Sequence, residues 1–140
     1  IARMRIRKSN NVKINNENVL KKIYKLSEGG KESIQAEQLS DIQSIPQLKT
    51  TLKRLEKKQI LSQVKETIIL NEKGKIAARE VIRKHRLWEI YLSKYFHLDT
   101  DHLHDDAEGI EHVITPEIEK HLITLLDRPE KDPHQSEIPY

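Results

Sequence analysis

The sequence of 140 residues contains no cysteine, so it can form neither a disulfide nor a thiolate ligand to a metal. It has no secretory-signal pattern, and no apolar run approaches the roughly 20 residues that a membrane-spanning helix needs. With only four glycines, it also lacks a glycine-rich loop of the kind that binds phosphate. These absences exclude a disulfide framework, a membrane span and a P-loop within these residues, and they favour a cytoplasmic location.

Hydrolase motifs are missing as well. The sequence has no H-E-x-x-H and no G-x-S-x-G, and it lacks a cysteine nucleophile. Residues 108–112 read E-G-I-E-H, which differs from the H-x-x-E-H of some zinc peptidases because Glu108 replaces the first histidine. We therefore expect that the protein is not an enzyme, and a metallohydrolase is the weakest alternative.

Charge is divided unevenly along the chain. Residues 1–80 contain 18 Lys and Arg against 9 Asp and Glu, whereas residues 81–140 contain 7 against 13 and hold all seven histidines. A basic half suits a polyanion such as DNA, and an acidic, histidine-rich half suits a different task. The alternative is two ordinary domains whose charges differ by chance.

Hydrophobic periodicity predicts three helices followed by a hairpin in the first half. The predicted helices span residues 15–28, 33–40 and 46–58, and the two strands lie within residues 60–70. Gly29-Gly30 stops the first helix, Ser33 caps the second, and Pro46 suits the first turn of the third. This order is that of a winged helix-turn-helix domain, which we place at residues 15–75. Residues 1–14, which are basic and show little periodicity, are expected to form a flexible arm or linker.

The third helix is the predicted DNA-binding element, because in this fold it enters the major groove while the hairpin lies against the backbone. Its exposed face carries Gln47, Lys49, Thr50, Lys53 and Arg54. Short hydroxyl and amide groups can reach base edges, while the cations neutralise phosphates. The sequence therefore predicts a surface for double-stranded DNA on this helix.

Residues 76–140 are expected to form a helical domain that ends in an extended, proline-containing tail. A long helix from about Asn71 to Phe96 precedes helices over about 101–113 and after Thr115-Pro116, with Thr115 as an N-cap. The apolar stripe of the long helix comprises Ile76, Ala77, Val81, Leu87, Trp88, Tyr91, Leu92 and Tyr95. This stripe has two explanations, which are packing within the domain and an interface in a homodimer. The predicted fold class is therefore mainly α, with a small β wing.

Six potential metal ligands occur at helical spacing in this second domain. His104, Glu108 and His112 are spaced i, i+4, i+8, with Glu111 beside them, and His85 and Glu89 form an i, i+4 pair on the preceding helix. All six are oxygen or nitrogen donors, which suits Mn(II), Fe(II), Co(II), Ni(II) or Zn(II). A solvated acidic helix face is the alternative interpretation.

Four stretches of the sequence are distinctive: L-N-E-K-G-K, R-K-H-R-L-W-E, L-H-D-D-A-E-G-I-E-H-V-I and D-P-H-Q-S-E-I-P. Together they resemble the diphtheria-toxin-repressor and manganese-transport-regulator (DtxR/MntR) family. The resemblance implies a winged-helix domain and a helical dimerisation domain. It also implies a homodimeric repressor that binds operator DNA, expected to be palindromic, when Fe(II) or Mn(II) is bound, and that controls metal-uptake genes. Co(II), Ni(II) or Zn(II) would substitute in vitro.

The resemblance also assigns site residues by position. Glu108, Glu111 and His112 match the principal metal ligands, and Asn18 falls where the family's first helix supplies another ligand. His85, Glu89 and His104 match an ancillary site. Lys21 replaces a carboxylate of the manganese branch, so the choice between Fe(II) and Mn(II) stays open. In the third helix, Pro46 and Thr50 match base-contacting positions, whereas four residues lie nearer the DNA backbone: Ser44, Gln47, Lys49 and Thr51.

The basic start of the chain, R-M-R-I-R-K, resembles repressor domains that are fused behind a metal ABC-transporter permease. In such a protein this segment would follow the last membrane helix on the cytoplasmic side. The chain would then originate in a longer permease polyprotein. A metal-sensing domain of a transporter that does not bind DNA is the main rival to the repressor hypothesis.

Overall fold

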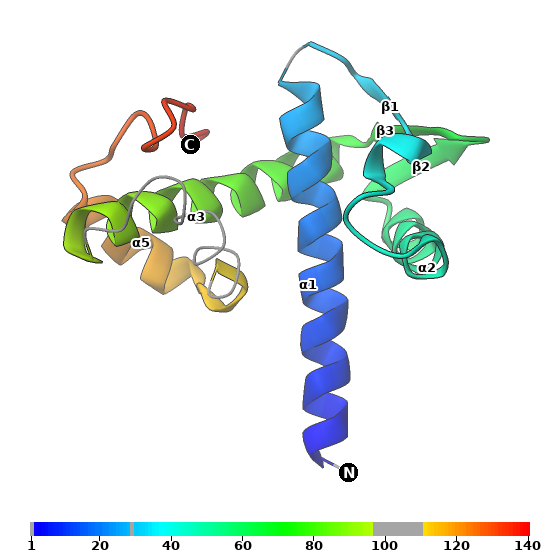
Figure 1. Ribbon diagram of the computed structural model, residues 1–140, viewed down its shortest axis with the longest axis horizontal. Coiled ribbons are helices and arrows are strands. Elements are labelled where there is room, and N and C mark those ends of the chain that lie inside the picture. The colour runs from blue at the N-terminus through cyan, green and yellow to red at the C-terminus, as the bar shows by residue number, and fades with distance from the viewer. Residues whose placement is uncertain (1, 29, 97–110) are drawn as a thin grey trace. The chain divides into compact units, whose positions relative to one another are not determined.

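The computed structural model describes residues 2–28, 30–96 and 111–140, which belong to two compact units (Figure 1). The first unit comprises Ile1–Arg79 and the second comprises Glu80–Tyr140. Helix α3 (Glu72–Phe96) contributes its first residues to the first unit and the others to the second. The protein is mainly helical with a small three-stranded sheet, which confirms the predicted fold class.

Helix α1 (Ala2–Ser27) is continuous over 26 residues, so the prediction of a flexible arm is wrong for residues 2–14. Ala, Met, Arg and Lys are all good helix formers. Once the buried turn around Val19 and Ile23 has formed, extending the helix toward the N-terminus needs no new nucleus. The sequence interpretation relied on apolar periodicity, which a helix extension does not require.

Ser33 begins a strand and not a helix. Strand β1 (Ser33–Gln35) pairs antiparallel with β3 (Thr67–Leu70), and a short 3-10 helix, Ala36–Leu39, follows it. Ile34, which lies opposite Ile68, is buried, whereas its two neighbours in β1 are exposed. Three residues are too few to display a strand period, so the cap-like Ser33 gave a misleading helix signal.

The predicted hairpin is confirmed. Strand β2 (Leu61–Val64) pairs antiparallel with β3, and the sheet order is β1-β3-β2. Lys65 in the connecting turn has a φ of 56°. A positive φ at this position is typical of a tight two-residue turn, which matches the twist of the two strands. The hairpin forms the wing of the first unit.

Helix α2 (Ile45–Lys57) is the predicted third helix, and its start follows from local chemistry. The Ser44 side chain accepts a hydrogen bond from the Gln47 backbone N–H, and Pro46 occupies the first turn. The buried core of the first unit consists of Val19, Ile23, Ile34, Leu39, Leu48, Leu52, Leu55, Leu61 and Ile68. Each such side chain contributes roughly 1.5–3 kcal/mol by leaving water.

The second unit packs α3 against helix α5 (Pro116–Leu125) and the C-terminal segment. Thr115 caps α5 by accepting a hydrogen bond from the Ile118 backbone N–H, as predicted. The core of this unit consists of Leu87, Ile114, Leu122, Leu126 and Ile138. The predicted helix over residues 101–113 lies outside the described residues up to 110, and Glu111–Val113 form a 3-10 helix. Over the described parts of the chain, no helix combines the length and apolarity needed to cross a membrane.

The start of α3 depends on a close backbone approach. A Cβ added to the buried Gly74 would lie 1.9 Å from the carbonyl oxygen of Ile60, which is too close for any side chain. The same carbonyl accepts a hydrogen bond from the Asn71 N–H at 3.0 Å, so it cannot move away freely. Gly74 therefore allows α3 to sit on the segment that leads into the wing.

Gly74→Ala is expected to lower the free energy of unfolding by roughly 1–3 kcal/mol, because the new methyl overpacks this contact. A decrease would identify the close contact, because replacing Gly by Ala inside a helix otherwise raises the free energy of unfolding by about 1 kcal/mol. Urea unfolding followed by circular dichroism measures the effect. The neighbouring exposed Lys75→Ala serves as the control and should change stability by less than about 0.5 kcal/mol. A stabilised Gly74→Ala variant would contradict the close approach.

Candidate metal centre and DNA-binding face

His85 lies at the centre of a buried cluster of imidazole and carboxylate groups in the second unit. His85 and Glu89 are one turn apart on α3, and the His85 Nε2 atom lies 2.6 Å from Glu89 Oε1. The other ring nitrogen, Nδ1, pairs with Oε2 of Glu111. All three side chains are only 2% exposed. The imidazole is thus held between carboxylates from two different segments.

The 3-10 helix Glu111–Val113 supplies the second part of the cluster. His112 Nε2 lies 3.3 Å from Glu111 Oε1, and both residues are buried. The sequence interpretation placed His85 in an ancillary site and Glu111 in a principal one. The structure brings these two residues into direct contact, so the two predicted ligand sets meet at His85.

A further histidine, His134, reaches the cluster from the C-terminal segment. Its Nε2 atom lies 3.6 Å from Glu89 Oε2, and its side chain is 41% exposed. The cluster therefore contains three imidazoles and two carboxylates, from α3, the 3-10 helix and the C-terminal segment. His134 was not predicted as a site residue, although it lies in the family-like stretch D-P-H-Q-S-E-I-P. The only local signal for this residue was the sequence Asp132-Pro133-His134, in which a potential ligand follows a turn-forming pair.

The C-terminal segment is not the predicted extended tail but a hydrogen-bonded loop. The buried Asp132 accepts hydrogen bonds through Oδ1 from the backbone N–H groups of His134 and Ser136, at 2.9 and 2.8 Å. Arg86 of α3, also buried, donates to the Glu137 carbonyl at 2.6 Å. Hydrogen bonds from backbone N–H groups to a nearby Asp side chain can take the place of pairing between strands. The loop thereby fixes His134 beside Glu89.

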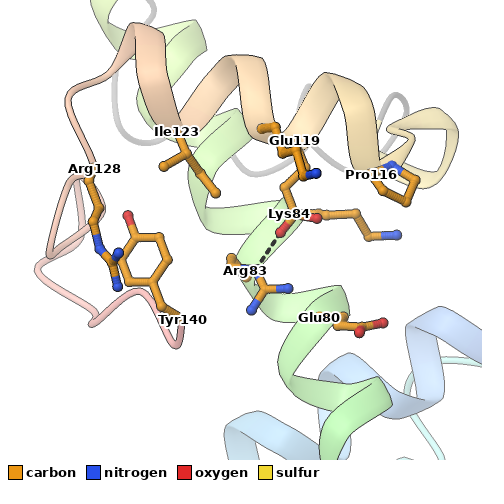
Figure 2. A pocket seen from close by; sticks show the side chains of 9 residues that line it. Glu80, Arg83, Lys84, Pro116, Glu119, Ile123, Arg128 and Tyr140 are labelled. Atoms are coloured by element: carbon orange, nitrogen blue, oxygen red, sulfur yellow. Dashed lines mark hydrogen bonds and ion pairs between the residues drawn. The ribbon is translucent and has the colours of Figure 1, made fainter.

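A concave site of about 440 Å³ lies on another part of the same unit, between α3, α5 and the C-terminal segment (Figure 2). Arg83 pairs with Glu119 of α5 and donates to the Pro139 carbonyl at 3.2 Å. Arg128 lies over the ring of Tyr140, 4.4 Å from the ring centroid. Burial raises the pKa of the Tyr140 phenol, which donates a hydrogen bond to the Pro129 carbonyl. These contacts join α3, α5 and the C-terminal segment, and two of these three, α3 and the C-terminal segment, also contribute to the His/Glu cluster.

The other predicted ligands are placed as follows. His104 and Glu108 lie outside the described residues. Asn18 lies on α1 of the first unit and is half-buried, and Lys21 is buried. Among the described residues, no group of three or more His, Asp or Glu side chains is arranged to hold a metal ion. The donor atoms of the cluster are directed at one another, as in a set of ion pairs, so the ligand roles remain predictions.

The predicted DNA-binding residues on α2 are mostly exposed. They include Ser44, Pro46, Gln47, Lys49, Thr50 and Lys53. Thr51 is an exception, because its side chain is completely buried and donates to Gln43 Oε1 at 3.0 Å. Thr51 therefore belongs to the inner side of the helix and not to a DNA-contacting face. Arg54 is half-buried, and its Nε atom donates to Asn16 Oδ1 at 3.0 Å.

The exposed side of α2 forms a shallow basic depression of about 730 Å³. Its lining consists of Thr50, Lys53, Arg54, Glu56, Lys57 and Lys58. Four of these six side chains are cationic and one is anionic, so the surface favours a phosphate backbone. Lys57 and Lys58 were not among the predicted DNA-binding residues, although the predicted helix extended to residue 58.

The described residues thus form a winged helix-turn-helix unit followed by a helical unit with a buried His/Glu cluster. Residues 71–140 match the family described as "Iron dependent repressor, metal binding and dimerisation domain". The chain belongs to the DtxR/MntR family. Its membership confirms the family resemblance found in the sequence.

Individual relatives match different lengths of the chain. The diphtheria toxin repressor of Corynebacterium jeikeium is 33% identical over 122 residues, which are 86% of this chain and 51% of that protein. A "Probable metal transport system membrane protein" of Chlamydia trachomatis is 43% identical over 70 residues, which are 50% of this chain and 16% of that protein. The chain thus spans about half the length of the repressor relatives it matches and a small part of the membrane protein.

Among solved structures, the manganese regulator SloR superposes with a TM-score of 0.77 and 31% identity, covering 89% of this chain and 59% of SloR. These repressors and regulators are not enzymes, which agrees with the sequence prediction that the chain is not one.

Asp132→Ala is expected to lower the free energy of unfolding of the second unit by roughly 1–3 kcal/mol, because two backbone N–H groups lose their acceptor. Urea unfolding followed by the fluorescence of Trp88, the only tryptophan, reports on this unit. His134→Ala removes the exposed imidazole but keeps the loop, so it should change stability by no more than about 0.5 kcal/mol. Equal stabilities of the parent and Asp132→Ala would show that Asp132 does not hold the loop.

Proposed function

We propose that this protein is a divalent-metal-dependent transcriptional repressor that controls metal-uptake genes. It would act in the cytoplasm and bind operator DNA as a homodimer. The observation that carries the proposal is the contact of His85 with both Glu89 and Glu111 in a buried cluster. Buried carboxylates are costly unless cations or strong donors balance them. A divalent cation would supply that balance at a place where nitrogen and oxygen donors already meet.

The donor set fits Fe(II) or Mn(II). Imidazole and carboxylate ligands suit both ions, and the chain has no thiolate that would select a softer metal. We propose Glu111 and His112, with Glu108, as principal ligands, and His85, Glu89 and His104 as the ancillary set. His134 is added to that set because of its position beside Glu89. Asn18 stays a proposed contributor from the first unit.

DNA recognition is proposed for α2 and the wing. The exposed Thr50 and Gln47 are short polar side chains suited to base edges, while Lys49, Lys53 and Lys57 are suited to phosphates. A two-fold dimer presents two copies of α2, which predicts a palindromic operator with half-sites about one helical turn apart or a multiple of that. Ser44 and Pro46, exposed at the start of α2, complete this face.

The dimer surface is proposed for the second unit. Leu87 of the apolar stripe and Leu122 of α5 belong to its core, so these two side chains pack internally. Tyr95, Phe96, Ile118 and Leu125 remain 44–59% exposed. Exposed large apolar side chains of this kind suit burial against a second copy of the chain.

A metal-sensing domain of a transporter is the second candidate function. It is favoured by the similarity of 70 residues to a metal transport membrane protein. The origin of this chain in a permease fusion would account for that similarity. The two candidates differ in one respect, because only the repressor needs the basic face of α2 to bind DNA.

The decisive experiment is a metal titration of DNA binding, measured by fluorescence anisotropy with the promoter of the chain's own operon. Mn(II) or anaerobic Fe(II) should raise DNA affinity at least tenfold over chelator, which requires only about 1.4 kcal/mol of coupling. Glu111→Gln keeps the size of the side chain but removes its charge, and it should abolish this increase while leaving basal binding unchanged.

Glu137→Gln is the matched control, since it removes an exposed carboxylate from the same unit. It should respond to metal as the parent does. Equal stimulation of the parent and Glu111→Gln would refute the metal-sensor proposal. No DNA binding by the parent under any metal condition would favour the transporter domain.

The face of α2 can be tested separately. Lys53→Gln should reduce the slope of log affinity against log salt by about one unit, because one phosphate contact is lost. Thr50→Ala should keep that slope and instead change the preference among operator variants. Lys120→Gln, an exposed cation of the second unit, should change neither quantity. If Lys53→Gln and Thr50→Ala both bound like the parent, the DNA-binding face would lie elsewhere.

A further inference from the structure

The N-terminal part of α1 carries an unusual concentration of positive charge. Residues 2–13, named here the basic helix segment, contain no acidic residue and five basic ones: Arg3, Arg5, Arg7, Lys8 and Lys13. The backbone of this segment is helical from Ala2, so the basic residues occupy positions on a continuous helix. None of the DNA-binding residues considered above belongs to it.

The C-terminal end of the basic helix segment adjoins the residues through which α1 is hydrogen-bonded to α2 and to the segment before it. Asn16 Oδ1 accepts a hydrogen bond from Arg54 Nε at 3.0 Å, and the Asn15 carbonyl accepts one from Gln43 Nε2 at 3.0 Å. From this junction the segment continues past α2 (Figure 1). At about 1.5 Å per residue, twelve residues span about 18 Å, which equals roughly five base pairs of duplex.

The distribution of residue types identifies the kind of partner. At about 100° per residue, the apolar positions Met4, Ile6, Val12 and Ile14 fall on four different sides of the helix. A helix that lies in a membrane surface, or in a groove of another protein, needs its apolar residues on one side. The basic positions are likewise distributed around the axis. This arrangement suits a charged polymer and not an apolar surface.

The free helix is also electrostatically unfavourable. Its first turn has no acidic residue to interact with the helix dipole, and Arg3 and Arg7 are like charges at i, i+4. Phosphates beside this segment would remove that repulsion. Nucleic acid bound on the basic face of α2 would bring phosphates to the same unit.

We propose that the basic helix segment is a second DNA-backbone-binding element, which extends the contact made by α2 along the duplex without reading its sequence. This inference rests on the proposed DNA-binding function of α2. It predicts that the segment contributes phosphate contacts on any DNA long enough to reach it.

The test compares the triple variant Arg3→Gln, Arg5→Gln, Arg7→Gln with the parent on a random-sequence duplex of 30 base pairs. Glutamine preserves helix propensity. The slope of log affinity against log salt should fall by about 2.7 units, since each lost contact accounts for about 0.9. Lys94→Gln, Lys120→Gln, Lys131→Gln removes three exposed charges from the second unit and should leave the slope unchanged. Amide hydrogen exchange in residues 2–13 should slow when DNA is added to the parent.

Other outcomes separate this inference from the proposed function. If Lys53→Gln lowers the slope but the triple arginine variant keeps the parent's slope, the basic helix segment does not bind DNA while α2 does. If the parent binds no DNA, both proposals fail. If the triple variant loses binding only to phosphatidylserine vesicles and binds DNA like the parent, the segment is a membrane-binding element and the inference is overturned.

Discussion

The second unit depends on the placement of His85 between two buried carboxylates. Glu89 comes from the same helix as His85, whereas Glu111 comes from the 3-10 helix Glu111–Val113. Removing such charges from water is costly, so the carboxylates are tolerated only where opposite charge or hydrogen-bond donors are fixed beside them. Arg86 and Asp132, which are also buried, hold the C-terminal loop next to the cluster. The polar network and the apolar core of Leu87, Leu122 and Ile138 thus share α3 and the C-terminal segment, while α5 contributes to the core and the 3-10 helix Glu111–Val113 to the network.

The uneven charge of the sequence has a structural counterpart in the two units. In the first unit, the cations of α2 are exposed, so water and a bound polyanion can screen them. In the second unit, Glu89, Glu111 and Asp132 are buried, where screening by water is weak. The first arrangement suits reversible association with DNA. The second suits a site whose energy changes strongly when a small, highly charged ion enters it.

The sequence predicted the elements whose determinants are local. Ser44 and Thr115 cap α2 and α5 where expected, because an N-cap requires only a side-chain oxygen and a neighbouring N–H. It failed where distant segments decide. Strand β1 exists because β3 pairs with it, and Thr51 is buried because the helix turns that side toward Gln43. The contact of His85 with Glu111, and the arrival of His134, follow from loop folding between positions far apart in the chain. The residue types of the site were therefore predictable, but their grouping was not.

Metal regulation of DNA binding requires that the second unit influence the first, and α3 is the element that belongs to both. Gly74, near its start, packs against Ile60 at the base of the wing, and His85 and Glu89 follow about three and four turns later on the same helix. Phosphate contacts alone would hold the protein on any DNA with a strength set by salt. A tenfold response to metal corresponds to about 1.4 kcal/mol, which is small beside the burial energy of either core. If the proposed metal site takes its ligands from α3 and from a separate segment, the metal needs only to favour one arrangement of a continuous helix over another.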